Sequence, residues 1–550
     1  MAIKSYKTFH IVLLFLLSTA IGVHSQSKYP TTTLEPYLDL QLTDAERDSL
    51  MDNLNRFQGS YKSIHQYLLN NNVPPAIVFD PLPTGFQVNE RQLPVNWNLP
   101  KEVLVPVNRE ELAFYPVYKL ATLIKNKKIT SVELTKLYLN RLKKFRDTLQ
   151  CVIMLMEESA LNQAKKADEE IAKGKYRGPL HGIPYGVKDL LAVEGTKTTW
   201  GAAGFESQTI NMTATVVKKL NDAGAILVVK LTMGALAMGD IWYGGVTKNP
   251  WNLKQGSSGS SAGSASATSA GLIAFAIGTE TLGSIVSPST RCGVTGLRPT
   301  FGRVSRTGAM ALSWSMDKIG PICRSAVDCG IVLDVIRGSD GADKTVRNAA
   351  FNYDGKADVK KLKVGYFKSL FESKYNNRAN DSIALNVLRS LGVQLQPVEL
   401  PADIPVSALS VILSSEAAAA FDELTRSNRD SLLTSQRKNA WPNSFRASRF
   451  IPAVEYINAN RIRQQLIEKY NEIAKAYDVI VSPSFGGTQL LTTNLTGHPC
   501  LVLPNGFNNQ KSPTSISFLG KLFGEANLVA LGRAYQDATD WDEKKPELFK

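Results

Sequence analysis

An alternation of helical and extended patterns, beginning near residue 115, most constrains the fold of this chain. Thr130-Ser131-Val132-Glu133 is a capping box, and the leucines between Leu134 and Leu142 that follow it have mostly helical spacing. This alternation predicts an α/β protein whose central mixed β-sheet is covered by helices on both faces. The later units are a helix near 214–222 before a strand at 225–230, a helix near 262–270 before a strand at 272–278, and strands at 362–367 and 478–481.

The composition is that of a globular protein. Hydrophobic residues make up 43% of the 550 residues and charged residues 20%, which is enough apolar surface for one large core or two smaller ones. The net charge is +14, but Lys and Arg are mixed with Asp and Glu, and no basic run is interleaved with aromatic residues. We therefore expect a solvated basic surface and no nucleic-acid partner.

The first 25 residues have the pattern of a signal peptide. Lys4 and Lys7 precede an apolar run at 11–23, and Val23-His24-Ser25 resembles a small-residue cleavage site. The thirteen residues of the apolar run fall short of the roughly 20 that a membrane-spanning helix needs. We expect cleavage near Ser25, no stable membrane span, and an exported product that is periplasmic or extracellular.

The segment from 26 to 110 differs from the α/β region. Thr43-Asp44-Ala45-Glu46 is a capping box that opens a helix to about Arg56. Five prolines then exclude a regular helix over a long extended stretch. We divide the chain into a signal peptide at 1–25, an N-terminal helical and extended appendage at 26–110 and a catalytic domain at 111–545. The prolines are Pro81, Pro83, Pro94, Pro100 and Pro106.

The cysteines indicate neither a metal site nor a disulfide framework. Their number is odd and no spacing forms a Cys-x-x-Cys pair, so we expect no metal and no cofactor. Cys323 and Cys329 are the only close pair, and the sequence leaves open whether they are bridged. The five are Cys151, Cys292, Cys323, Cys329 and Cys500.

A Gly/Ser-rich stretch at 256–264 is the most unusual part of the chain. It lies in mid-chain beside a helix–strand unit, where a flexible linker is not expected. Small residues there let backbones approach closely, and exposed N–H groups can bind an anion. A second serine, Ser284, lies 24 residues after Ser260.

Two nucleophiles compete. Gly259-Ser260-Ser261-Ala262-Gly263 fits the Gly-x-Ser-x-Gly elbow of α/β-hydrolases, with Ser261 as nucleophile and His498 as the only histidine that follows it. The elbow requires a preceding strand, and residues 251–258 are polar. The favoured alternative is a serine activated by a neutral, buried lysine, Lys188. Taken alone, that lysine is better explained by a surface position or an ion pair with Asp189.

Five ordered segments resemble the amidase signature family of serine hydrolases. The resemblance covers roughly residues 115–545, continues through Asp317-Lys318-Ile319-Gly320-Pro321, and implies the amidase signature fold with an N-terminal helical extension. The segments are His181-Gly182-Ile183-Pro184 leading to Val187-Lys188-Asp189, Asn249-Pro250-Trp251-Asn252, Gly259-Ser260-Ser261-Ala262-Gly263-Ser264, Gly278-Thr279-Glu280-Thr281-Leu282-Gly283-Ser284-Ile285, and Cys292-Gly293-Val294-Thr295-Gly296-Leu297-Arg298-Pro299-Thr300.

By this resemblance Ser284 is the nucleophile, Ser260 the relay hydroxyl after a cis peptide bond, and Lys188 the base. Ser260 both donates and accepts a hydrogen bond, so it can pass the proton on and later return it to the leaving amine. The resemblance also implies an oxyanion hole, in which one donor is worth about 3 kcal/mol of transition-state stabilisation. Its donors are the backbone N–H groups of Thr281, Leu282, Gly283 and Ser284.

Three positions depart from the commonest family pattern. Glu280 replaces Asp, Leu282 replaces Gly or Asp, and Val286 stands where many members carry Arg. The Glu-Thr-x-Gly-Ser form occurs in the family, so the departures bear on the substrate rather than on catalysis. A bulky Leu282 beside the scissile bond is expected to narrow the pocket.

The resemblance implies an amidase that cleaves small, aryl, fatty acyl or peptide amides to an acid and an amine or ammonia. Export argues against the tRNA-dependent amidotransferase role that some members have. Two alternatives are an esterase that uses Ser261 and a non-catalytic envelope binding protein. The oligomeric state, the role of residues 26–110 and the natural amide are not predicted.

Overall fold

A computed structural model of the chain describes residues 30–66 and 69–550. The chain divides into two compact units, Met1–Leu69 and Asn70–Lys550. The division falls inside the segment that we assigned to the appendage, whose second part therefore belongs to the larger unit. The predicted signal peptide, residues 1–25, lies outside the described residues.

The described part of the first unit is helical. It contains two short 3-10 helices, η1 (Pro30–Thr33) and η2 (Glu35–Leu38), and the long helix α1 (Asp44–Ile64). The predicted capping box is confirmed, because Thr43 N–H donates to the Glu46 carboxylate (2.6 Å) and Glu46 N–H donates to Thr43 Oγ1 (3.3 Å). The helix continues past Arg56, where the prediction ended it, and none of its residues is buried.

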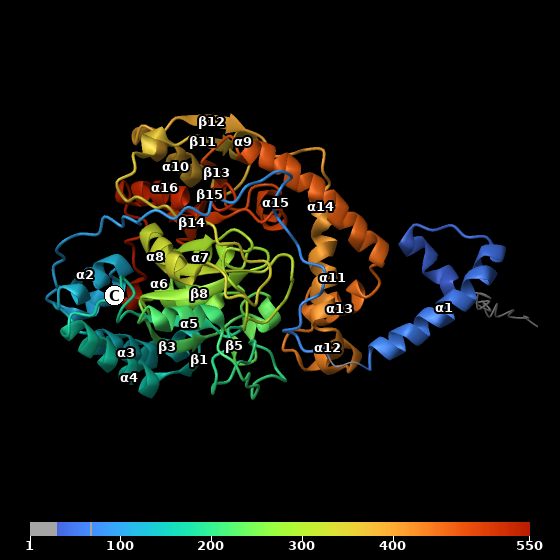
Figure 1. The fold of residues 1–550 in the computed structure, drawn as a ribbon, viewed down its shortest axis with the longest axis horizontal. Helices are drawn as coiled ribbons and strands as arrows, with labels where there is room; N and C mark the ends of the chain where they lie inside the picture. The colour runs from blue at the N-terminus through green and yellow to red at the C-terminus, as the bar shows by residue number, and fades with distance from the viewer. Residues whose placement is uncertain (1–29, 67–68) are drawn as a thin grey trace, which may run out of the picture. The chain divides into compact units, whose positions relative to one another are not determined.

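The larger unit is built on a mixed sheet, in which eleven strands are ordered β1-β3-β2-β8-β10-β9-β14-β15-β13-β11-β12 within residues 70–550 (Figure 1). Neighbours are parallel in the β3-β2-β8 and β13-β11-β12 groups and antiparallel elsewhere. The predicted α/β class with a mixed sheet is confirmed. The strands are β1 (Val152–Leu155), β2 (Pro184–Lys188), β3 (Ile226–Leu231), β8 (Phe275–Glu280), β9 (Thr295–Arg298), β10 (Lys318–Cys323), β11 (Val364–Phe367), β12 (Leu395–Val398), β13 (Val479–Pro483), β14 (Cys500–Phe507) and β15 (Pro513–Gly520).

Helices cover both faces of this sheet, and none of the described helices is long and apolar enough to cross a membrane. Two short ribbons, β4 (Ile241–Trp242) with β5 (Gly245–Val246) and β6 (Lys248–Asn249) with β7 (Asn252–Gly256), stand apart from it. The helices are α2 (Val117–Lys125), α3 (Ser131–Leu149), α4 (Glu157–Ala172), α5 (Thr215–Asp222), α6 (Ala262–Ser269), α7 (Val286–Cys292), α8 (Ala326–Ile336), α9 (Lys368–Glu372), α10 (Arg378–Ser390), α11 (Val411–Ala420), α12 (Asp422–Arg426), α13 (Trp441–Ser448), α14 (Ala453–Ala474), α15 (Gln489–Leu495) and α16 (Glu525–Asp537).

The predicted helix–strand units agree with the structure to within a few residues. The helix near 262–270 is α6, and its predicted partner strand is β8, which begins at Phe275 rather than Leu272. The strand begins late because Gly271 has a φ of +65°, a conformation that favours glycine, and the chain turns there before it enters the sheet. The capping prediction at Thr130 is confirmed, since Glu133 N–H donates to Thr130 Oγ1 at 3.0 Å.

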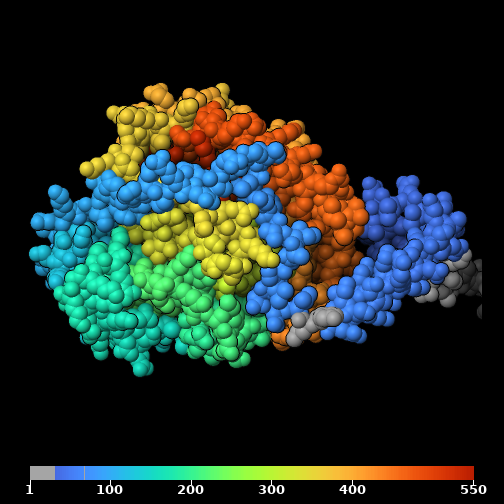
Figure 2. All heavy atoms as spheres, viewed as in Figure 1, coloured from blue at the N-terminus to red at the C-terminus, as the bar shows by residue number. Residues whose placement is uncertain are grey.

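Residues 71–107 contain no regular helix, and the prolines from Pro81 onward had predicted this for most of the stretch. This light-blue segment runs over the surface of the larger unit (Figures 1 and 2). It is attached through Gln92, whose side chain accepts from Phe351 N–H (2.8 Å) and donates to Phe351 O (3.0 Å), and through Trp97, whose ring lies 5.1 Å from that of Tyr353. The segment is therefore part of the larger unit rather than a free arm.

Candidate active site

Lys188 is the last residue of β2, and it is completely buried, which confirms the predicted lysine at the end of a buried strand. β2 lies between two parallel neighbours, β3 and β8, near the middle of one half of the sheet. The Lys188 amine donates to Ser260 Oγ (2.8 Å), Ser261 Oγ (3.2 Å) and Thr279 Oγ1 (2.8 Å). Three hydroxyls from two different segments thus converge on one amine.

The surroundings of Lys188 favour its neutral form. Burial lowers its pKa to about 7, against a smaller opposing effect of Asp317 and Glu280. No carboxylate in the described residues lies within ion-pair distance of its amine, because Asp189 is paired with Lys230 instead, at 2.9 Å. The simple ion pair between Lys188 and Asp189 is therefore not formed.

Ser260 lies in the loop between β7 and α6, and its side chain is buried against Lys188. The peptide bond between Gly259 and Ser260 is cis, which confirms that part of the resemblance. Gly259 is packed so closely that a Cβ there would meet Gly239 O at 1.8 Å. Only glycine fits this position, so the small residues of the Gly/Ser-rich stretch serve close backbone packing.

Ser261 is held in place by the backbone of Thr279. Its hydroxyl donates to Thr279 O (3.0 Å) and accepts from Thr279 N–H (3.1 Å). The strand before it, β7, belongs to a two-stranded ribbon and not to the central sheet that a nucleophile elbow requires. Both observations count against Ser261 as a nucleophile.

His498, the base that the elbow would need, contacts other groups. Its Nδ1 is 2.9 Å from Thr496 Oγ1, and its ring packs edge-on against Tyr470. Burial, reinforced by the charge of Arg298, lowers its pKa to about 3. Among the described residues no hydrogen bond joins His498 to Ser261.

Ser284 lies in the loop that connects β8 to α7, with 8% of its surface exposed. Ser261 N–H donates to Ser284 O (3.2 Å), so this loop and the Ser260 loop are joined through their backbones. Gly283 has a φ of +80°, which favours glycine at the turn before the serine. Within the described residues no acceptor is bonded to the backbone N–H groups of the four proposed oxyanion donors, Thr281, Leu282, Gly283 and Ser284.

Glu280 anchors the Ser284 loop through hydrogen bonds to its backbone. Its carboxylate is fully buried and accepts from Ile285 N–H (2.7 Å), Val286 N–H (2.9 Å) and Arg298 Nη1 (2.8 Å). Burial alone would raise its pKa, but Arg298 and these hydrogen bonds lower it to about 2. Sequence reasoning noted Glu280 only as a departure, and the overlooked signal was Arg298, a charged residue within an apolar strand.

Thr281, the next residue, is anchored by Asp317. The Thr281 hydroxyl donates to Asp317 Oδ1 (2.5 Å), and the other carboxylate oxygen accepts from Leu312 N–H (2.8 Å) and Ser313 N–H (3.0 Å). Burial raises the Asp317 pKa. The motif that contains Asp317 was recognised in the sequence, but neither the role of Asp317 nor the contact of Thr279 with Lys188 was inferred.

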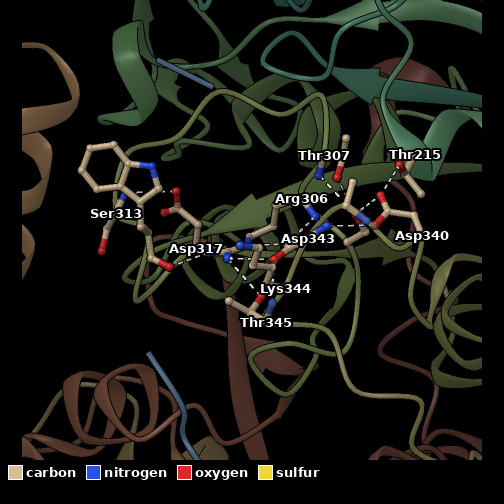
Figure 3. Close-up of polar contacts among 12 residues, drawn as sticks. Thr215, Arg306, Thr307, Ser313, Asp317, Asp340, Asp343, Lys344 and Thr345 are labelled. Carbon is tan, nitrogen blue, oxygen red and sulfur yellow. Dashed lines mark hydrogen bonds and ion pairs between the residues drawn. The ribbon is translucent and has the colours of Figure 1, made fainter. Parts of the chain in front are cut away.

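A cavity of about 1390 Å³ reaches this site through Thr279 and Thr281. Neither Leu282, which is partly exposed, nor Ser284 lines this cavity, so the narrowing of the pocket by Leu282 stays a prediction. At the rim Arg306 is fully engaged, donating to Asp343 Oδ2 (3.0 Å) and Trp314 O (2.6 Å) (Figure 3). The cavity wall includes residues from the helix-rich region between 415 and 467.

The described residues contain no group of three or more His, Cys, Asp or Glu that could hold a metal ion. All five cysteines are free and buried. Cys329 Sγ lies 3.8 Å from Thr295 O, and Thr295 is the strand partner of Cys323. Cys323 and Cys329 are hydrogen-bonded to each other as free thiols, and no disulfide joins them.

The chain is similar to known proteins over most of its length. The family model described as Amidase matches residues 133–490. A glutamyl-tRNA(Gln) amidotransferase subunit of Coxiella burnetii is 32% identical over 77% of this chain and 97% of its own length, and the corresponding protein of Marinomonas sp. is 33% identical over 78% and 98%. The crystal structure of the peptide amidase from Stenotrophomonas maltophilia superposes with a TM-score of 0.69 at 28% identity, covering 78% of this chain and 97% of that enzyme.

The fold, the buried lysine–serine cluster and these similarities define an amide-hydrolysing enzyme. The chain belongs to the amidase signature family, which confirms the resemblance seen in the sequence.

Proposed function

We propose that this enzyme hydrolyses carboxylic amides through an acyl-enzyme on Ser284, with Ser260 and Lys188 as the proton relay. The observation that carries the proposal is the 2.8 Å contact between the Lys188 amine and Ser260 Oγ, in a buried setting that favours the neutral amine. A neutral amine can accept a proton, whereas a charged one cannot.

In the proposed reaction Ser284 Oγ attacks the amide carbonyl and releases its proton to Ser260, which passes its own proton to Lys188. The N–H groups of residues 281–284 stabilise the oxyanion, since they have no acceptor among the described residues. The proton then returns through Ser260 to the departing nitrogen, and the C–N bond breaks. Water attacks the ester by the same route, which releases the acid and restores Ser284.

Trapping the nucleophile tests this proposal. A fluorophosphonate probe forms a stable phosphonyl ester with an activated serine, and peptide mass mapping identifies the labelled residue. We expect the label on Ser284 and its loss in Ser284→Ala, together with at least about a thousandfold loss of anilide hydrolysis. Ser261→Ala is the matched control and should keep the label on Ser284. A label on Ser261 would establish the elbow mechanism instead.

For the substrate we propose a free small, aryl, fatty acyl or peptide amide. The similarity to a peptide amidase supports this class, whereas the similarity to the amidotransferase proteins supports glutamine as the competing substrate. Initial rates on a panel of these amides and glutamine decide between them. Hydrolysis of glutamine alone would reject our choice.

We further propose that the protein is exported, with its signal peptide cleaved near Ser25. Lys4, Lys7 and the apolar run at 11–23 support this proposal, and export in turn supports a small, aryl, fatty acyl or peptide amide over glutamine as the substrate. N-terminal sequencing of the protein recovered from the periplasm and the medium should give a first residue near 26. Recovery of the intact N-terminus from the cytosol would contradict export.

A further inference from the structure

Residues 71–80 lie across the cavity and are anchored at both ends. At the first end Asn71 pairs with the backbone of Ala311, donating to its carbonyl (2.9 Å) and accepting from its N–H (2.7 Å). The side-chain amide thus imitates a β-bridge to the loop before Asp317. In Figure 2 this light-blue segment lies between the yellow and orange parts of the larger unit, which form the opposite walls of the cavity.

The second end of the segment is anchored by aromatic and charged contacts. The Phe79 ring meets Phe301 edge-on at 5.1 Å, and the guanidinium of Arg463 lies 3.5 Å from the Phe79 ring centroid. Arg347 forms an ion pair with Asp80 at 3.3 Å. A segment held at both ends in this way has a defined position over the cavity.

Between the anchors the segment presents apolar side chains to solvent. Ile77 is 86% exposed and Val78 43% exposed, and both line the cavity. Exposed aliphatic side chains gathered at the mouth of a cavity are typical of a binding surface, because a bound apolar group would cover them. The inner wall is also largely apolar, with Leu190, Met310, Leu312, Trp314 and Ile319 among its residues.

The charged groups of the cavity wall are largely satisfied by their own neighbours. Glu416 accepts from Ser315 N–H (3.0 Å) and Tyr456 OH (2.9 Å), and Arg463 donates to Ser315 O (2.9 Å). Arg306 is bound by Asp343. A substrate therefore meets mainly apolar surface along the path that ends at Thr279 and Thr281.

We infer that residues 71–80 form the outer wall of the substrate pocket and select amides that carry an extended apolar group. This inference rests on the proposed function for the location of the reacting bond. The segment precedes the family match, which begins at residue 133. The inference therefore gives a function to residues 71–80, part of the segment 26–110 for which the sequence predicted none.

Replacing the exposed aliphatic pair tests the inference. The double variant Ile77→Ser/Val78→Ser is compared with Leu104→Ser/Val107→Ser, which removes two exposed aliphatic side chains (88% and 105%) away from the cavity. Substrates are 4-nitroacetanilide and its decanoyl homologue. We expect kcat/KM for the decanoyl anilide to fall about tenfold in the wall variant only, with the acetyl anilide unchanged. An equal loss on both anilides, or no loss, would overturn the proposed wall.

Binding without turnover separates this inference from the proposed chemistry. In the Ser284→Ala background, calorimetry should show that the decanoyl anilide binds more tightly than the acetyl anilide, and that Ile77→Ser/Val78→Ser removes most of the difference. Failure of the wild type to hydrolyse the two anilides and every other amide of the panel would reject the proposed function, while the calorimetric comparison would still decide the wall. Equal affinity for the two anilides would reject the wall.

Discussion

At Lys188 burial works against the charged form of the amine. In water a lysine is protonated at neutral pH, but inside the protein its ammonium would lose hydration that three hydroxyls replace only in part. The nearest acids are engaged elsewhere: Asp189 pairs with Lys230, Asp317 holds Thr281, and Glu280 pairs with Arg298. This arrangement makes Lys188 a base that works near neutral pH.

The activity should therefore have an acidic limb. Because the Lys188 pKa is lowered to about 7 and the neutral amine is the active form, kcat/KM should fall about tenfold per pH unit below 7. Stability should also rise with pH between about 7 and 10.5, since the unfolded lysine binds a proton there that the folded lysine does not. Anilide hydrolysis measured from pH 5 to 9 checks the activity limb.

The matched variant is Lys188→Met, an apolar side chain of similar length that suits the buried position and has no amine to accept a proton. It should be inactive at every pH, with the fold intact by circular dichroism. A wild-type profile that is flat down to about pH 5 would exclude lysine as the base.

At the scale of elements, the loop between β8 and α7 takes its shape from Glu280. The residue ends β8, and its carboxylate binds the first N–H groups of α7 while Arg298 in β9 and Asn494 in α15 donate to it from neighbouring elements (2.8 and 2.9 Å). Four elements therefore meet at one buried charge, on the residue that immediately precedes the proposed oxyanion donors in the chain. A substitution of Glu280 should therefore disturb the loop between β8 and α7 more than a substitution at the surface.

Glu280→Gln tests this role. Removing one partner of a buried ion pair leaves Arg298 uncompensated, so we expect about 3 kcal/mol of destabilisation in urea unfolding at pH 7. Folding lowers the Glu280 pKa from 4.5 to about 2. The ionised carboxylate therefore stabilises the folded protein fully above pH 4.5 and loses this effect as the pH falls toward 2. The difference in unfolding free energy between the wild type and Glu280→Gln should shrink over the same range. The control variant is Glu90→Gln, because Glu90 is exposed. Equal stability of the two variants would refute the structural role of Glu280.

At the scale of the whole molecule, the two units differ in how they are built. The larger unit has its own core, and all residues proposed for catalysis and for the pocket wall belong to it. In the first unit α1 buries none of its residues, although it is capped at its N-terminus by Thr43. Stability and catalysis should therefore depend on the larger unit alone.

A chain that begins at Asn70 should keep its activity. Because this truncation removes no core residue of the larger unit, kcat/KM on the two anilides should stay within about twofold and the thermal midpoint should not fall. Initial rates check kcat/KM, and differential scanning calorimetry checks the thermal midpoint. Loss of folding would mean that residues 30–69 support the catalytic unit.

Much of the fold and of the site can be predicted from the sequence because it depends on local patterns. The helix caps at Thr43 and Thr130, the α/β alternation, the glycines of the 256–264 loop and the ordered motifs around Lys188 and Ser284 are properties of neighbouring residues. Local hydrogen bonds and steric limits act over a few residues, so a short window of sequence contains their cause.

Only the tertiary structure decided which partners the buried charges and hydroxyls have. On sequence grounds Ser261 competed with Ser284 as the nucleophile, and its bonds to Thr279 count against it. The pairing of Asp189 with Lys230 and the bridging of the cavity by residues 71–80 join segments far apart in the chain. Such contacts depend on how strands and loops pack in space, a global balance of burial and pairing that no local pattern encodes.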